Sequence, residues 1–100
     1  MDLKQASVLC EKAWSQYAAK FQINRDDVFY LLKMQEELGE LTRIFLELRG
    51  SEKKRSASSE ELKKKFAADI AVLVGNALIL AHHFDVDLEA NIKAKFPVQE

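Results

Sequence analysis

Apolar residues recur at steps of three and four along the first fifth of the chain. Between positions 2 and 21 this spacing links Leu3, Ala6, Cys10, Ala13, Trp14, Tyr17 and Phe21. Side chains so spaced lie on one face of an α-helix, which predicts a helix over 2–21. The polar run Asn24-Arg25-Asp26 interrupts the pattern. Asp26 or Asp27 is therefore expected to cap a second helix by accepting a hydrogen bond from its first turn.

The second helix is predicted to run from this cap to Gly50, a residue suited to ending a helix. Its apolar positions are Val28, Leu31, Leu32, Leu38, Leu41, Phe45 and Leu48. The polar positions 51–59 predict an exposed, mobile loop. Ser58 followed by Glu61 has the form of a capping box, which predicts the start of a third helix there.

The third helix is predicted to end near Phe84, and Asp87 is expected to cap a short fourth helix that ends at Lys95. From Phe66 to Leu80 the third helix is apolar nearly all round, which indicates burial on several sides. Two long helices joined by a polar loop form an antiparallel hairpin. Because the flanking helices can cover only part of such a hairpin, we expect the chain to associate with copies of itself.

Composition supports an all-α fold in a single domain over residues 1–100. The sequence is 48% hydrophobic and has three glycines and one proline, which leaves little turn chemistry for β-hairpins. A net charge of −1 gives no field that favours nucleic acid. Cys10, the single cysteine, is compatible with a reducing cytoplasm. With no leader-like segment and no uninterrupted apolar run of roughly 20 residues, we expect a cytoplasmic protein that does not enter membranes.

Three acidic residues are the first candidates for chemistry. Glu37 and Glu40 stand one helical turn apart and project their carboxylates from one face. Asp69 lies in an apolar run, where an ionised side chain is costly to bury without a partner. If the long helices pair antiparallel, the three carboxylates can form a cluster that binds Mg²⁺. The commoner reading of such spacing is a solvated glutamate face and an aspartate that accepts a hydrogen bond.

The segment 31–41 reads Leu-Leu-Lys-Met-Gln-Glu-Glu-Leu-Gly-Glu-Leu. It resembles the Glu-Glu-x-x-Glu signature of the MazG-like all-α nucleoside triphosphate pyrophosphohydrolases. Upstream, Trp14 and the run 24–26 resemble that family's first helix and the loop after it. Downstream, the run 80–89 resembles the helix end before the family's last helix, and Lys95 resembles a lysine late in that helix. The likeness extends over most of the chain, from Trp14 to Phe96.

This resemblance implies a four-helix MazG-like fold that assembles into dimers or tetramers. It also implies hydrolysis of a nucleoside triphosphate, ribose or deoxyribose, to the monophosphate and pyrophosphate with Mg²⁺ as cofactor. Carried over to this chain, Glu37 and Glu40 match the first two metal-binding acids, and Asp69 is the third. Glu36 or Glu37 is expected to activate the attacking water, and the sequence does not choose between them.

The chain departs from the family where a second pair of acids, Glu-x-x-Asp, is expected on the third helix. The spacing back from Asp87 places Asp69 at the glutamate position and Val72 at the aspartate position. A competing register places Asp69 at the aspartate position and Phe66 at the glutamate position. We favour the first, since it needs no gap downstream. In either register three of the four acids remain.

Four further residues are candidates for contact with substrate. Lys33 can meet a phosphate, although an ion pair with Glu37 is the favoured reading. Lys95 can reach phosphates, Trp14 can stack on a base or belong to the core, and Asn76 can replace the missing ligand because it follows Asp69 by two turns. Two rival functions stay open: a nucleotide-binding homologue that does not hydrolyse its ligand, and a helical interaction module without a ligand.

Overall fold

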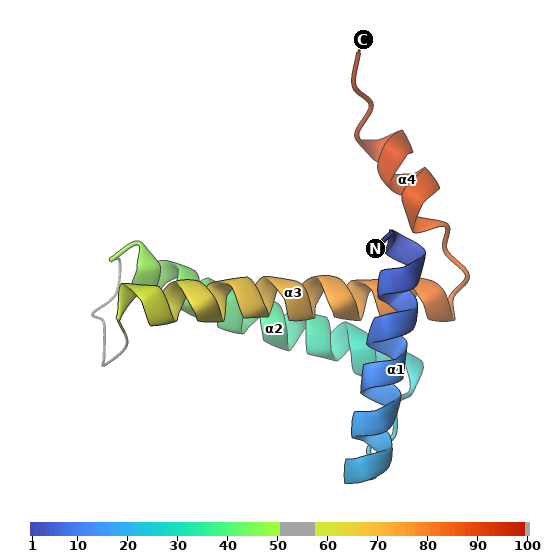
Figure 1. The fold of residues 1–100 in the computed structure, drawn as a ribbon, viewed down its shortest axis with the longest axis horizontal. Helices are drawn as coiled ribbons and strands as arrows, with labels where there is room; N and C mark the ends of the chain where they lie inside the picture. Colours follow the sequence, from blue (N-terminus) through green and yellow to red (C-terminus); the bar gives the residue numbers. More distant parts are fainter. Residues whose placement is uncertain (51–57, 100) are drawn as a thin grey trace.

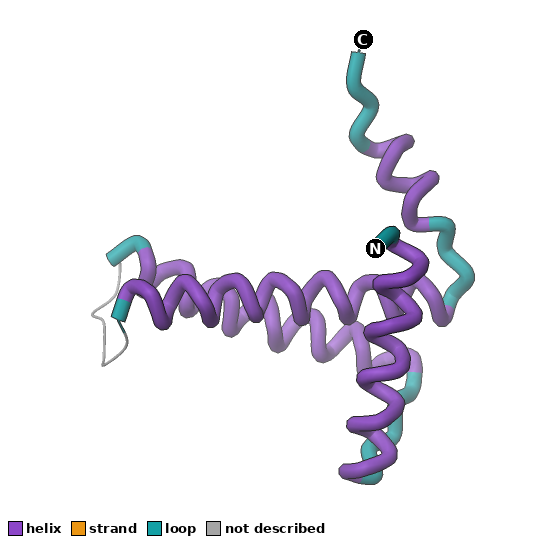
Figure 2. Tube along the Cα trace, in the orientation of Figure 1, coloured by secondary structure: helices purple, strands orange, loops and turns teal. Residues whose placement is uncertain are grey.

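A computed structural model describes residues 1–50 and 58–99. It consists of α1 (Leu3–Phe21), α2 (Asp27–Leu48), α3 (Ser59–His83) and α4 (Leu88–Lys95) (Figures 1 and 2). The described residues contain no strand, so the prediction of an all-α chain is confirmed. Most of the loop predicted at 51–59 lies outside the described residues.

The helix boundaries follow from the capping residues that the sequence indicated. Asp26 accepts a hydrogen bond from the backbone N–H of Phe29 at 2.9 Å. Ser58 and Asp87 accept equivalent bonds in the first turns of α3 and α4, at 3.2 and 3.0 Å. Gly50, with a φ of 74°, takes the left-handed conformation just beyond α2. These caps therefore set where α2, α3 and α4 start, as local chemistry predicts.

The long helices α2 and α3 run side by side in opposite directions, and the core lies between them (Figure 1). Most of the fully buried residues fall on a seven-residue spacing: Tyr30 and Ile44 on α2, and Leu62 and Asn76 on α3. Such spacing keeps one seam of each helix against its neighbour. Glu37 and Asp69 occupy the middle of the two series. The seam thus carries charged residues in an otherwise largely apolar contact.

Helix α1 crosses α3 near the carboxyl end of α3 (Figure 1). The indole N–H of Trp14 donates a 2.9 Å hydrogen bond to Oδ1 of the buried Asn76. The Trp14 ring also packs edge-on against Tyr17, Phe29 and Tyr30, with centroids 5.4 to 6.1 Å apart. Trp14 therefore joins α1 to both long helices, as expected for a residue of the core.

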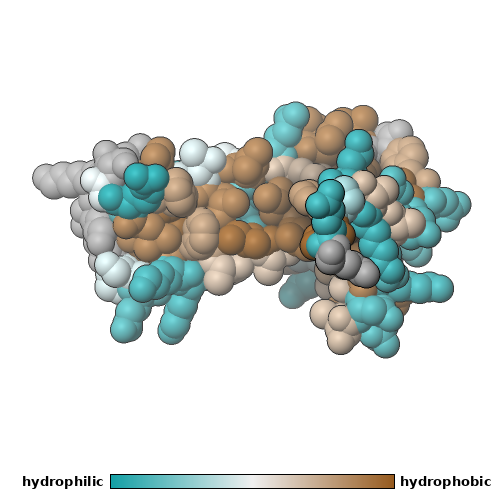
Figure 3. Space-filling model, turned by 90° about the horizontal axis from the view of Figure 1, so that it is seen from above, coloured by the Kyte–Doolittle hydropathy of each residue, from teal (hydrophilic) through white to brown (hydrophobic). Residues whose placement is uncertain are grey.

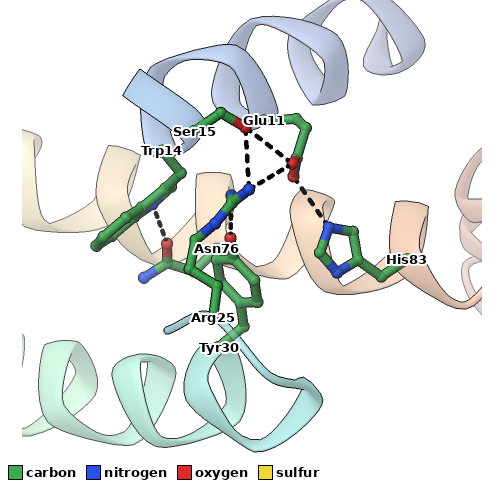
Figure 4. A network of polar contacts seen from close by, with 7 residues as sticks. All are labelled: Glu11, Trp14, Ser15, Arg25, Tyr30, Asn76 and His83. Carbon is green, nitrogen blue, oxygen red and sulfur yellow. Dashed lines mark hydrogen bonds and ion pairs between the residues drawn. The ribbon is translucent and has the colours of Figure 1, made fainter. Parts of the chain in front are cut away.

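A polar network completes this junction (Figure 4). The guanidinium of Arg25 donates to the hydroxyl of Tyr30, to Ser15 Oγ at 2.9 Å and to Glu11 Oε1 at 3.1 Å. The other carboxylate oxygen of Glu11 lies 3.0 Å from Nε2 of His83 on α3. Partial burial alone would raise the pKa of Glu11, but the hydrogen bonds to His83 and Arg25 and the charge of Arg25 outweigh it, so that pKa lies below its usual value. One arginine thus connects α1 to the start of α2.

Helix α3 is the most apolar element. An 18-residue window within Ser59–His83 has a mean hydropathy of 1.5 and is 17% buried, which meets the length and composition of a membrane span. Core helices of soluble proteins meet the same criterion, so this is weak evidence for a membrane span. The expectation that the chain does not enter membranes remains a prediction.

Replacing Arg25 by methionine should lower the free energy of unfolding by about 2–3 kcal/mol, because Glu11, Ser15 and Tyr30 lose their shared donor. Urea denaturation measures the change. Lys93→Met is the control, since Lys93 pairs with Glu89 where the two side chains are 76% and 70% exposed. That control should cost less than about 0.5 kcal/mol. Equal effects of the two substitutions would contradict the role given to Arg25.

Candidate functional site

The centre of the α2–α3 seam brings Glu37 and Asp69 together, as the sequence predicts. Burial, followed by the charge of Asp69, raises the pKa of Glu37 above its usual value. Glu36 and Glu40 add smaller effects in the same direction. Oε2 of Glu37 is buried and has no hydrogen-bond partner among the described residues. A partly buried anion beside a second anion is a site that a cation or a proton stabilises.

Glu40 does not join this pair, so the predicted three-carboxylate cluster is not formed. Its carboxylate turns toward Arg43, whose Nη2 lies 2.6 Å from Oε1. The hydrogen bond from Arg43 holds the pKa of Glu40 below its usual value. In the part of the chain that the structure describes, no group of three or more His, Cys, Asp or Glu side chains is placed to hold a metal ion. The positive charge of Arg43, one turn onward, attracts the Glu40 carboxylate, whereas the negative charge of Glu37 repels it.

Lys33 also pairs with a different residue from Glu37, the partner that the sequence favoured. Its Nζ lies 3.5 Å from Oε1 of Glu36, whereas the expected ion pair with Glu37 is not formed. Lys33 nevertheless lowers the pKa of Glu37 through its charge, so it lies near the seam. It also lies over the ring of Phe29, with Nζ 5.8 Å from the centroid. The side chains of Lys33 and Glu36 therefore stand together at the edge of the carboxylate pair.

The two positions proposed for the missing acid differ in their surroundings. Phe66 is half-buried and its ring lies 6.2 Å from that of Phe45 on α2. Val72 is 40% exposed and lines a cavity between α1 and α3. An acid at position 66 would replace an aromatic contact, whereas position 72 is open. Val72 faces this cavity rather than the Glu37–Asp69 pair, and the choice between the two registers stays a prediction.

The fold brings Asn76 and Trp14 together, and their side chains form a hydrogen bond with each other. The indole N–H of Trp14 binds Oδ1 of Asn76, while Nδ2 of Asn76 is buried without a partner among the described residues. Oδ1 of Asn76 is thus engaged by Trp14, and the role of Asn76 as a replacement ligand stays a prediction. Lys95 lies on α4, which leads away from the seam (Figure 1).

An apolar groove lies between α1 and α3, with a volume of about 450 Å³. The α1 side consists of Cys10, Ala13, Trp14 and Tyr17, and the α3 side of Ala71, Val72, Gly75 and Asn76. The helices approach closely here: a Cβ added to Gly75 would lie 3.2 Å from Sγ of Cys10. Gly75 thus permits the crossing that forms the groove. The helical pattern did not predict this groove or the Arg25 network, because both depend on the angle at which α1 crosses α3.

Replacing Glu37 by glutamine should stabilise the protein at neutral pH in the absence of divalent metal. The raised pKa of Glu37 means that its protonated form is favoured by folding. Its contribution is therefore fully present below the pKa of the unfolded chain, and is lost as the pH rises through the folded pKa. Glutamine stays neutral, so the substitution should raise the free energy of unfolding at pH 7 and have a smaller effect at pH 4.

Denaturation at pH 4 and pH 7 in chelator measures this difference. Glu36→Gln is the control, since the Glu36 side chain is 69% exposed and should respond by less than half as much. A loss of stability in Glu37→Gln at pH 7 would show that the Glu37 carboxylate is satisfied in the fold.

Comparison with known proteins adds no assignment to this geometry. No protein-family model matches the sequence, and no curated protein and no solved structure matches it either.

Proposed function

We propose that this protein is a Mg²⁺-dependent nucleoside triphosphate pyrophosphohydrolase whose metal site is centred on Glu37 and Asp69. The observation that supports this proposal is the partly buried carboxylate pair, in which Oε2 of Glu37 has no partner among the described residues. The Glu-Glu-x-x-Glu run that resembles the MazG-like signature supports it independently. The all-α fold supports it as well, because that is the fold class that the resemblance implies.

The donor set fits one Mg²⁺ ion. Mg²⁺ usually takes one or two carboxylates and completes its octahedron with water and substrate phosphates. Glu37 and Asp69 provide hard oxygen donors and two negative charges at the seam. Glu40 can add a third donor, because its ion pair with Arg43 is readily broken. The two side chains are each 45% exposed, and such exposed pairs contribute at most about 1 kcal/mol to stability.

When bound, Mg²⁺ neutralises charge on the phosphates and lowers the pKa of water. Glu36 is the residue we assign to accept a proton from the attacking water, because Glu37 faces Asp69 in the seam. Lys33 lies next to Glu36 and is the side chain best placed to contact a phosphate oxygen. The partly buried setting of Glu37 and Asp69 strengthens each of these electrostatic contacts relative to open water.

A second candidate is a homologue that binds a nucleotide without hydrolysing it. It is favoured by the two carboxylates, rather than three, that the seam brings together among the described residues. One ion can hold the phosphates of a ligand, whereas in-line displacement is assisted most when two ions steady the attacking and leaving oxygens. Binding and turnover therefore separate the two candidates.

Replacing Asp69 by asparagine should weaken Mg²⁺-dependent binding of a non-hydrolysable deoxynucleoside triphosphate at least tenfold, since it removes one of two charged ligands. Isothermal calorimetry measures the affinity, and pyrophosphate release from a panel of nucleoside triphosphates measures turnover. Glu60→Gln, an exposed change in the first turn of the same helix, is the control.

Unchanged Mg²⁺ dependence in Asp69→Asn would refute the metal site. Binding without pyrophosphate release from any substrate in the panel would favour the second candidate. Absence of any nucleotide binding would leave only the helical interaction module.

Self-association belongs to the same proposal. The chain exposes 7880 Å², whereas a compact monomer of this length is expected to expose about 5,800 Å². Its radius of gyration is 16.1 Å, against about 13 Å for a compact domain. Hydrophobic residues follow the α2–α3 body on the face seen in Figure 3. The difference of about 2,000 Å² exceeds the 800 Å² or so that each partner buries in a standard interface.

Light scattering at micromolar concentration should therefore give the mass of a dimer or tetramer. The expected driving force is burial of α3 residues such as Ile70, Val72 and Val74, which are 39–50% exposed in one chain. A folded monomer under these conditions would refute the assembly without bearing on the metal site.

A further inference from the structure

Helix α4 buries none of its residues against the rest of the described chain. Leu88, Ile92 and Phe96 recur every four residues, and Ile92 and Phe96 are 42% and 74% exposed. None of the residues in Leu88–Lys95 is buried. Eight residues are too few for a stable helix in water without packing, even with a good cap. Ile92 and the C-cap residue Phe96 therefore leave apolar surface of this segment uncovered in a single chain.

The groove between α1 and α3 has the matching character. Seven of its eight lining residues are apolar or weakly polar, and Tyr17 and Val72 at its rim are 49% and 40% exposed. Its volume of about 450 Å³ lies in the range of cavities that enclose a drug-sized group. An aromatic side chain and the aliphatic side chain one turn before it fit such a space.

The groove is not covered by α4 of the same chain, since none of its lining residues lies on α4. Cys10 and Trp14 face Gly75 and Asn76, which form the groove on one side of α1. The end of α3 and the start of α4 adjoin the first turns of α1 on the other side, where a second cavity is lined by residues that include Leu3, Ser7, Ala81 and Leu88. Figure 1 shows α4 leading away from this point.

We propose that α4 is an exchanged arm: it seats Ile92 and Phe96 in the α1–α3 groove of a second copy, whose own α4 does the same in return. Reciprocal exchange gives a closed two-fold dimer in which each arm is used once. It covers both apolar surfaces, and the excess exposed area of the chain exceeds what a stable dimer needs. This inference rests on the self-association proposed above and goes beyond it in naming the contact.

Charge supports the same occupant. The last turn of α4 carries Lys93 and Lys95. The groove includes Val72, one helical turn beyond Asp69, whose charge raises the pKa of Glu37. An arm seated through Phe96 would place Lys95 of the second copy near Val72, one helical turn from Asp69.

Disulfide trapping tests the contact, since Cys10 is the only native cysteine and lines the groove. Ile92→Cys should form a covalent dimer with Cys10 under mild oxidation, seen on a non-reducing gel. Ala94→Cys is the matched control, because it lies two residues away on the opposite face of α4. The dimer should disappear when Cys10→Ser is added to Ile92→Cys.

Three outcomes would overturn the exchange. A disulfide within one monomer, between Cys10 and the cysteine introduced at position 92, would show that α4 folds back onto its own groove. Equal trapping of positions 92 and 94 would reflect random collision, and no trapping at either would place the arm elsewhere. Because the readout needs no nucleotide, these outcomes are independent of the proposed hydrolysis, and light scattering of the unmodified protein reports assembly by itself.

A second measurement does not depend on cysteine chemistry. Ile92→Asp should raise the dimer dissociation constant at least tenfold in dilution light scattering, because a charge replaces an apolar anchor. Helix content by circular dichroism should change little, since Ile92 is not buried within its own chain. An unchanged dissociation constant would refute the proposed binding of α4 in the groove of a second copy.

Discussion

The contact between α2 and α3 is the constraint on which the core and the carboxylate pair depend. Its seven-residue spacing places Tyr30 in register with Asn76, and Ile44 with Leu62, so the helices bury one seam along their length. Helix α1 then docks on the end of that seam through Trp14. The same register sets Glu37 against Asp69. The carboxylate pair is therefore a consequence of the packing that forms the core, and the fold cannot separate the two side chains without slipping the seam.

Two acids in a seam contradict the rule that buried charges are paired with opposite charges. The seam offers Oε2 of Glu37 no donor among the described residues, and Lys33, the cation whose charge lowers the pKa of Glu37, is engaged by Glu36. Elsewhere the chain pairs acids that are at least partly buried: Glu11 binds Arg25 and Glu47 binds Arg43. A chain that pairs those acids and leaves Glu37 unsatisfied is consistent with a site that a ligand completes.

Local rules predicted the four helices and the caps of the last three, because Asp26, Ser58 and Asp87 act within four residues of sequence. The antiparallel pairing of two apolar stripes was enough to place Asp69 opposite Glu37. The contacts of side chains with two possible partners were harder to predict. Glu40 has Glu37 one turn before it and Arg43 one turn after it. Spacing alone does not say whether its carboxylate shares a metal site with Glu37 or forms an ion pair with Arg43. The Arg25 network and the groove depend on the crossing of α1, which no periodicity encodes.

Helix α3 connects the proposed site to the proposed assembly, because different faces of it adjoin the two. Asp69 faces α2, whereas Val72, about 60° away around the helix, faces the groove. Covering Val72 with a second copy removes water from the side of α3 that adjoins Asp69. A drier setting strengthens both the repulsion between the two carboxylates and their attraction to a cation. Assembly should therefore make the metal-free seam less stable and the metal-bound seam more stable, so that binding of a divalent ion and association of the chains reinforce each other.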